Sequence, residues 1–98
     1  MYVGSLSLDL LLGGVRSLKE KRSVVRPVVA ELRRRFAVSA AEVEYPHLYR
    51  RTVIGVAVVS GNATHCKEVL DACERLVAGR PEVELLSARQ RLSNEEDE

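Results

Sequence analysis

Residues 13–36 read GGVRSLKEKRSVVRPVVAELRRRF, and the rest of the chain is arranged around this segment. It opens with two glycines, which suit a sharp turn, and continues with the pattern of a helix. Ser17 and Glu20 have the capping-box spacing, in which the Ser17 hydroxyl accepts from the Glu20 N–H and the Glu20 carboxylate accepts from the Ser17 N–H. Because Pro27 removes one helical hydrogen bond, we expect a kinked helix or a helix that restarts at Pro27.

The apolar residues of this helix recur at spacings of three, four and seven, which places them on one buried face. They are Leu18, Val25, Val28, Val29, Leu32 and Phe36. At about 100° per residue, four cations share an arc of roughly 60° beside that face. These four are Lys19, Arg22, Arg26 and Arg33. The net charge of the whole chain is only +1, so the positive charge is local to this region.

The rest of the sequence predicts four strands and one further helix. Residues 2–12 place leucines on one face and Ser5, Ser7 and Asp9 on the other, which is typical of a half-buried strand. Residues 37–43 predict a second strand, and residues 52–60 predict a central strand because both of its faces are apolar. A helix over residues 63–78 and a last strand over residues 83–92 complete the pattern.

This order predicts an α+β, ferredoxin-like βαββαβ domain over residues 1–92. Right-handed crossovers place both helices on one face of a four-stranded antiparallel sheet. The acidic residues 93–98 are expected to form a disordered tail. We expect the core to contain Leu6, Leu8, Leu10, Val25, Val29, Leu32, Ile54, Val56, Val58, Val69, Leu70, Cys73, Leu76 and Val77.

The sheet face away from the helices is predicted to carry small and apolar side chains. On the third strand these are Val53, Gly55, Ala57 and Val59. Because an open apolar face of this size tends to be covered, we expect a homodimer with two-fold symmetry to form through it.

Three segments resemble a bacterial family of unknown function, the YlxP-like family (domain of unknown function 503). They are residues 13–22, GGVRSLKEKR, residues 38–43 with Ala-Glu-Val, and residues 54–60, IGVAVVS. The resemblance implies a ferredoxin-like fold. Members of the family are often encoded beside transcription-elongation and translation-initiation factors and ribosome-binding factor A, which implies a role around RNA or the ribosome. Pro27 departs from the pattern expected of the family.

The charge asymmetry and this resemblance lead to a hypothesis of a non-catalytic cytoplasmic protein that binds structured RNA or a ribosomal particle. Binding would use phosphates, with little readout of base sequence. The expected contacts are Arg16, Lys19, Lys21, Arg22, Arg26, Arg33 and Arg34. The alternative function is a dimeric protein-interaction or small-ligand regulatory module, and the alternative for the helix is an ordinary solvated face.

A loop over residues 44–51 is the other candidate contact surface. Its chemistry-bearing residues are Tyr45, His47, Tyr49, Arg50 and Arg51. Stacking of RNA bases on the sheet is not expected, because the central strands lack the aromatics that RNA-recognition domains use there. Gly13 and Gly14 fit neither the Walker nor the dinucleotide spacing, although a phosphate at this helix start stays an alternative to a plain turn.

Catalytic and metal sites are not expected. Acylphosphatases resemble this topology and use an Arg in the first loop, for which Arg16 is a counterpart, and a strand Asn, but Asn62 only follows a strand. His47 and His65 have no ligand spacing, and Cys66 and Cys73 fall on an apolar helix face. We therefore expect no cofactor and no metal. No apolar run approaches about 20 residues and no signal peptide is recognised, so we expect a cytoplasmic protein without membrane contact.

Overall fold

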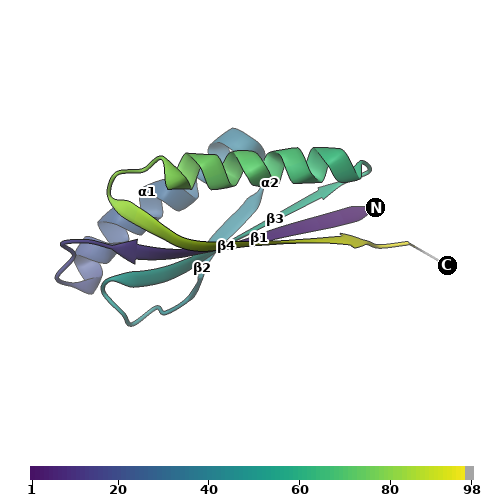
Figure 1. Cartoon of the computed structure of the whole chain (residues 1–98). Coiled ribbons are helices and arrows are strands. Elements are labelled where there is room, and N and C mark those ends of the chain that lie inside the picture. The colour runs from purple at the N-terminus through teal and green to yellow at the C-terminus, as the bar shows by residue number, and fades with distance from the viewer. Residues whose placement is uncertain (97–98) are drawn as a thin grey trace.

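The computed structural model of the protein describes residues 1–96 and confirms the ferredoxin-like prediction (Figure 1). Its elements are β1 (Tyr2–Leu12), α1 (Leu18–Phe36), β2 (Ser39–Glu44), β3 (Arg51–Ser60), α2 (Ala63–Ala78) and β4 (Val83–Asn94). The four strands form one antiparallel sheet in the order β2-β3-β1-β4. Both helices cover the same face of this sheet, and no helix or strand among residues 1–96 lies over the opposite face (Figure 1).

The core lies between the helices and this sheet. The register pairs Leu6 with Val56 and Leu8 with Ile54, so the alternating leucines of β1 and the aliphatic residues of β3 meet the helices together. Of the residues predicted for the core, most are buried, and only Val29, Val69 and Leu76 are partly buried at its margin. The predicted direction of the sheet faces is therefore confirmed.

Helix α1 is continuous through Pro27, so it does not restart there. The Ser17 hydroxyl accepts from the Glu20 N–H at 3.1 Å, as the capping box predicts. The Glu20 carboxylate, however, accepts from the N–H of Arg16 at 2.7 Å and not from that of Ser17. The helix ends at Phe36, and the left-handed φ of 49° at the capping residue Ala37 turns the chain toward β2. This turn delays the start of β2 to Ser39, two residues after the predicted start.

Strand β4 extends beyond its predicted end at residue 92. Ser93 pairs with Val3 and Asn94 pairs with Tyr2, and the N–H of Glu95 donates to the carbonyl of Met1 at 2.7 Å. The domain therefore continues past residue 92, and the prediction of a tail that is disordered from residue 93 is wrong for these positions. The reason is that β1 begins at Tyr2 and offers them partners. Residues 97 and 98 of the predicted tail lie outside the described residues.

Candidate nucleic-acid interface

A groove lies between α1 and the edge strand β2, with a volume of about 370 Å³. We call it the α1 groove. It is lined by Leu18, Lys21, Arg22, Val25, Arg26, Val29, Ala30, Arg33, Ala41, Glu42 and Pro46. On the α1 side, the groove is lined by apolar residues at the edge of the buried helix face. It is also lined there by three of the four cations in the predicted basic arc. The structure brings Arg22, Arg26 and Arg33 together as the sequence predicts.

The cations of this arc lie on the surface and keep their charge uncompensated. Within residues 1–96, Lys19, Arg22, Arg26 and Arg33 form no ion pair. Arg33 uses its Nε to donate to the carbonyl of Ala40 at 3.0 Å, which anchors the side chain across the edge of β2. Arg22 and Arg33 are eleven residues apart, so the row of guanidinium groups spans roughly 16 Å of helix.

The structure corrects the predicted role of Lys21, because this residue is buried and only 3% exposed. Its Nζ lies 2.8 Å from Oε2 of Glu42 and donates to the carbonyl of Tyr45 at 2.6 Å. The Thr52 hydroxyl donates to the same Glu42 carboxylate. Lys21 therefore joins α1 to β2 and to the start of the next loop, and the prediction that it belongs to the binding surface is wrong.

A signal for the position of Lys21 is present in the sequence. Leu18, Lys21 and Val25 are separated by three and four residues, which is the spacing of the buried helix face. Glu42 follows Ala40 by two residues in β2, so it lies on the helix side of the sheet. Each residue taken alone reads as an exposed charge, and only docking of α1 on β2 pairs them.

Arg34 lies apart from the α1 groove. Arg34 and Arg35 lie 3.8 Å and 3.7 Å from the Glu31 carboxylate, which also accepts from Arg80 in the turn between α2 and β4. The guanidinium of Arg35 also stacks on Phe36, at 5.5 Å from the ring centroid. These cations share one carboxylate, so they offer less uncompensated charge than the arc on α1.

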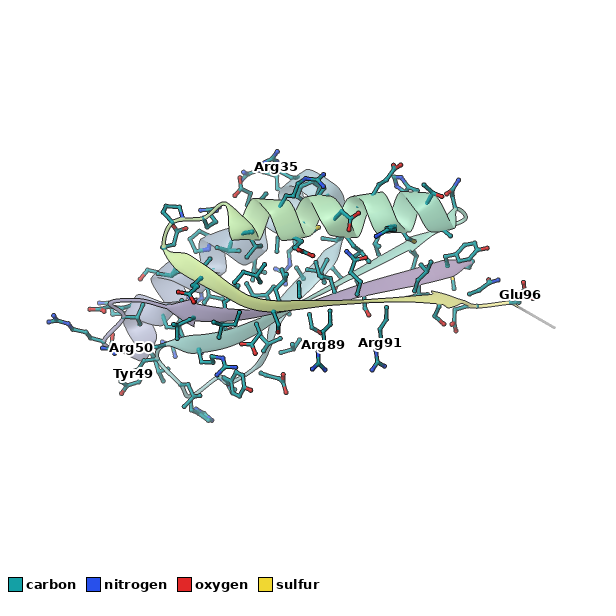
Figure 2. All side chains as sticks on the ribbon, viewed as in Figure 1. Arg35, Tyr49, Arg50, Arg89, Arg91 and Glu96 are labelled. Atoms are coloured by element: carbon teal, nitrogen blue, oxygen red, sulfur yellow. The ribbon has the colours of Figure 1, made fainter. Side chains whose placement is uncertain are left out.

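Arg16 is also separated from the helix row and joins the predicted loop surface. It lines a hollow of about 700 Å³ together with Leu11, Val15, His47, Leu48, Tyr49, Arg50 and Arg51. Arg50 is held there because its Nε donates to the carbonyl of Val15 at 3.2 Å. Figure 2 shows Tyr49 and Arg50 at the end of the molecule opposite the chain termini. Four of the five predicted loop residues thus gather with Arg16, in what we call the loop hollow.

Arg51 has a structural partner on β1 and also lies over the ring of Tyr45. Two nitrogens of Arg51 donate to the two carboxylate oxygens of Asp9 at 2.7 Å and 2.8 Å, and the guanidinium lies 5.1 Å from the ring centroid of Tyr45. The hydrogen bonds from Arg51 hold the pKa of Asp9 below its usual range. Tyr45 has a left-handed φ of 60°, and Lys21 binds its carbonyl. This cluster fixes one end of the loop and leaves His47, Tyr49 and Arg50 as its exposed part.

The open face of the sheet differs from the prediction at two places. Val53 is only 4% exposed, so it has almost no surface left to lose in a dimer, and its inclusion in the predicted dimer face is wrong. Gly55 is half-buried beneath Val43, whose Cγ1 lies 3.0 Å from where a Cβ on Gly55 would stand. Ala57 and Val59 are exposed as expected, Val59 by 64%.

The same face carries two arginines to which sequence analysis assigned no role. Arg89 and Arg91 of β4 pair with Ser7 and Ser5 of β1, and Figure 2 shows both side chains directed away from the helices. The alternation of residues 87–93, SARQRLS, contains the signal for this placement. The open face is therefore cationic along the β4 edge rather than uniformly small and apolar.

The two cysteines belong to the core. Both thiols are free and buried, and burial raises the pKa of Cys73 to about 11. A thiol with this pKa is not a nucleophile near neutral pH. Among residues 1–96, no group of three or more His, Cys, Asp or Glu side chains is arranged to hold a metal ion. No helix in this part of the chain has the length and apolar character needed to cross a membrane.

Comparison with known proteins identifies the family. Residues 3–90 match the model of the family described as "Protein of unknown function (DUF503)". The chain belongs to this family. It is similar to a curated protein of Bacillus subtilis (strain 168), "Uncharacterized protein YlxP", with 28% identity over 82 residues, covering 84% of this chain and 89% of that protein. This result confirms the YlxP-like resemblance.

A solved structure is distantly similar to this chain. It is titled "Structure of the REP associates tyrosine transposase bound to a REP hairpin" and matches with a TM-score of 0.42 and 12% identity. The match covers 95% of this chain, and this chain spans only 58% of that one.

Proposed function

We propose that this protein is a non-catalytic, cytoplasmic protein that binds structured RNA or a ribosomal particle through phosphates held along α1. The observation that carries the proposal is the row of Arg22, Arg26 and Arg33 around the α1 groove, without an ion pair among residues 1–96. Like charges placed side by side along one helix repel one another, so a row of cations without carboxylate partners adds nothing to the stability of the fold and is available to bind an anionic partner. Guanidinium groups also match phosphate geometry, because their donors form a planar fork.

The contact would be electrostatic and independent of sequence. Each cation that neutralises a phosphate releases counterions, so the affinity falls steeply as salt is raised. With four contacts from Lys19 and the three arginines, log K should fall by roughly 3 to 4 units per unit of log salt. Base stacking plays no part, since the open sheet face has serines and small residues where stacking aromatics would stand.

The test compares two double variants with the same change in net charge. Arg22→Glu with Arg26→Glu reverses two cations of the α1 groove. Lys67→Glu with Arg75→Glu reverses two exposed cations on α2, on another surface. Binding to a structured RNA and co-sedimentation with ribosomal subunits are measured at low and moderate salt, with circular dichroism to check that both variants are folded.

The groove variant should bind at least about tenfold more weakly and lose about two units of salt slope, while the α2 variant stays near the parent. Equal losses for the two variants would mean that only net charge matters. Unchanged affinity and slope in the groove variant would remove α1 from the mechanism.

A second candidate function, a protein-interaction or small-ligand regulatory module, is favoured by the loop hollow. Leu48 and Tyr49 are each about half exposed there, beside Arg16 and Arg50. A large apolar and aromatic surface next to arginines is typical of protein contact sites. In that case Tyr49→Ala abolishes partner binding, and the affinity for RNA does not change with the α1 variant.

A further inference from the structure

The outer edge of β4 is the longest unpaired feature of the fold. β4 is an end strand of the sheet and has 12 residues, whereas the other end strand, β2, has six. The β2 edge is interrupted by a register shift between Glu42 and Glu44, and Arg33 binds its Ala40 carbonyl. Between residues 87 and 94, β4 keeps one regular register with β1. A long, regular edge without proline is a template for another strand.

The hydrogen bonds of β4 show which backbone groups point outward. The N–H of Glu95 donates to Met1, and the amino group of Met1 donates back to the carbonyl of Glu95 at 3.3 Å. In an antiparallel ladder such pairs alternate with pairs that make no bonds to each other. Arg89, Arg91 and Ser93 therefore direct their backbone groups to β1. The N–H and C=O groups of the residues between them, Ala88, Gln90, Leu92 and Asn94, point to the outer edge.

We propose that this edge pairs antiparallel with the same edge of a second copy of the chain, around a two-fold axis at Leu92. The two sheets then become one continuous sheet of eight strands. Leu92 pairs with Leu92 of the second copy, and Gln90 pairs with Asn94, through the outward backbone groups. Arg91 then lies opposite Ser93, and Arg89 lies opposite Glu95. From Ala88 to Glu96 this ladder offers roughly ten backbone hydrogen bonds.

Charge selects the second copy as the partner. Residues 89–96 read RQRLSNEE, with two arginines before Leu92 and two glutamates after it. An antiparallel arrangement places the basic half of one strand against the acidic half of the other. Directly opposite pairs that are not hydrogen-bonded approach to about 4.5 Å between Cα atoms, so Arg89 and Glu95 are within reach of each other.

Charge and the pairing of Leu92 together select the register. Moving the axis to Arg91 places Arg91 against Arg91 of the second copy, and moving it to Gln90 places Arg89 against Arg91. Both arrangements oppose like charges across the strands, which is unfavourable. Moving it to Ser93 places Arg91 opposite Glu95, which is also attractive, but it leaves Leu92 opposite the polar Asn94. The axis at Gln90 also gives Leu92 an apolar partner, Ala88, but it opposes Arg89 and Arg91. Of these four axes, only the one at Leu92 combines opposite charges across the strands with an apolar partner for this leucine, which is 50% exposed on the single chain.

This interface leaves the α1 groove uncovered. The groove lies beside β2, at the opposite edge of the sheet from β4. The two grooves of the dimer would stand at the two outer ends of the joined sheet. The proposal does not depend on RNA binding, and a negative result in either test leaves the other unaffected.

The experiment uses a charge exchange followed by mass measurement. Arg89→Glu places a carboxylate opposite Glu95, and Glu95→Arg places a cation opposite Arg89, so each single variant should raise the dimer dissociation constant about tenfold. The double variant, Arg89→Glu with Glu95→Arg, should return it to within about threefold of the parent. Sedimentation equilibrium and light scattering over a concentration series give these constants.

Backbone pairing is tested separately by Leu92→Pro, which removes an N–H that points outward and is not used within the single chain. This variant should be monomeric and folded. The matched control, Ala57→Glu, alters the open face and should leave the dimer intact. A monomeric parent at high micromolar concentration overturns the proposal. A charge exchange that does not restore the dimer, or a dimer lost in Ala57→Glu but kept in Leu92→Pro, also overturns it and assigns association to the open face.

Discussion

Replacing Lys21 with methionine tests whether α1 is locked to β2 by a buried ion pair. Methionine keeps most of the apolar length of the side chain and removes the ammonium. The carbonyl of Tyr45 then loses its donor at 2.6 Å, and the Glu42 carboxylate loses its cation at 2.8 Å and keeps the Thr52 hydroxyl. The fold should survive, but with a lower free energy of unfolding.

The magnitude follows from the burial of the two partners. Removing one partner of a fully buried pair costs about 3–5 kcal/mol. Glu42 is 28% exposed and keeps one hydrogen bond, so water recovers part of that cost. Replacing a buried ammonium by a thioether also removes the desolvation penalty of Lys21. We therefore expect Lys21→Met to lower the free energy of unfolding by about 2 kcal/mol.

Urea unfolding followed by circular dichroism measures this change. With an m-value of roughly 1.5 kcal/mol/M for a chain of this size, the midpoint should fall by about 1 M, with m unchanged. Lys19→Met is the matched control on the exposed side of the helix, and it should cost less than about 0.5 kcal/mol. In a double-mutant cycle with Glu42→Gln, the pair should show a coupling of about 1–2 kcal/mol.

Two outcomes would refute the reasoning. If Lys21→Met unfolds at the midpoint of the parent, the buried pair makes no net contribution to stability. If the variant is more stable, the ion pair costs more to desolvate than it returns, and its role would be to specify how the loop after β2 is held.

Two further predictions concern the sheet. Gly4→Ala should lower stability by about 1–3 kcal/mol, measured as a fall in melting temperature, because a Cβ there would lie 2.9 Å from the Leu70 side chain in a filled core. Asp9→Asn should cost stability at neutral pH, and the difference from the parent should vanish in acid. Arg51 holds the pKa of Asp9 below its ordinary value of 3.8, so the contribution is present above that value and is lost as pH falls through the lowered one. Urea midpoints measured from pH 7 downward through the acid range check this, and a difference that does not shrink as pH falls below 3.8 would contradict it.

Local chemistry explains why most of the fold can be predicted from the sequence. The caps at Ser17 and Asn62 each bind an N–H three residues ahead, so their effect is contained in four residues of chain. The leucines of β1 show their buried face through a period of two, and α2 shows its own through a period near 3.6. Such periods exist before any long-range contact forms.

The candidate site is predictable where its residues share one helix, and it is not predictable where a residue meets a partner far along the chain. The arc of Arg22, Arg26 and Arg33 follows from helical geometry alone, and it was predicted. The fate of Lys21 depends on Glu42 and on the Tyr45 carbonyl, which lie 21 and 24 residues further along. Its spacing marks a buried position, yet a lysine is buried only where a carboxylate meets it.

What the sequence determines and what only the tertiary structure decides differ in how far apart along the chain the interacting residues lie. Periodicity and capping describe neighbours within about one turn or one pleat, so the sequence is enough to place helices, strands and the basic arc. Whether Lys21 meets a carboxylate, whether Val53 is covered and whether Arg80 reaches Glu31 depend on strands and helices brought together by folding. Only the tertiary structure decides these outcomes, because the exposure of a side chain and its charge partners are set by which helices and strands pack together.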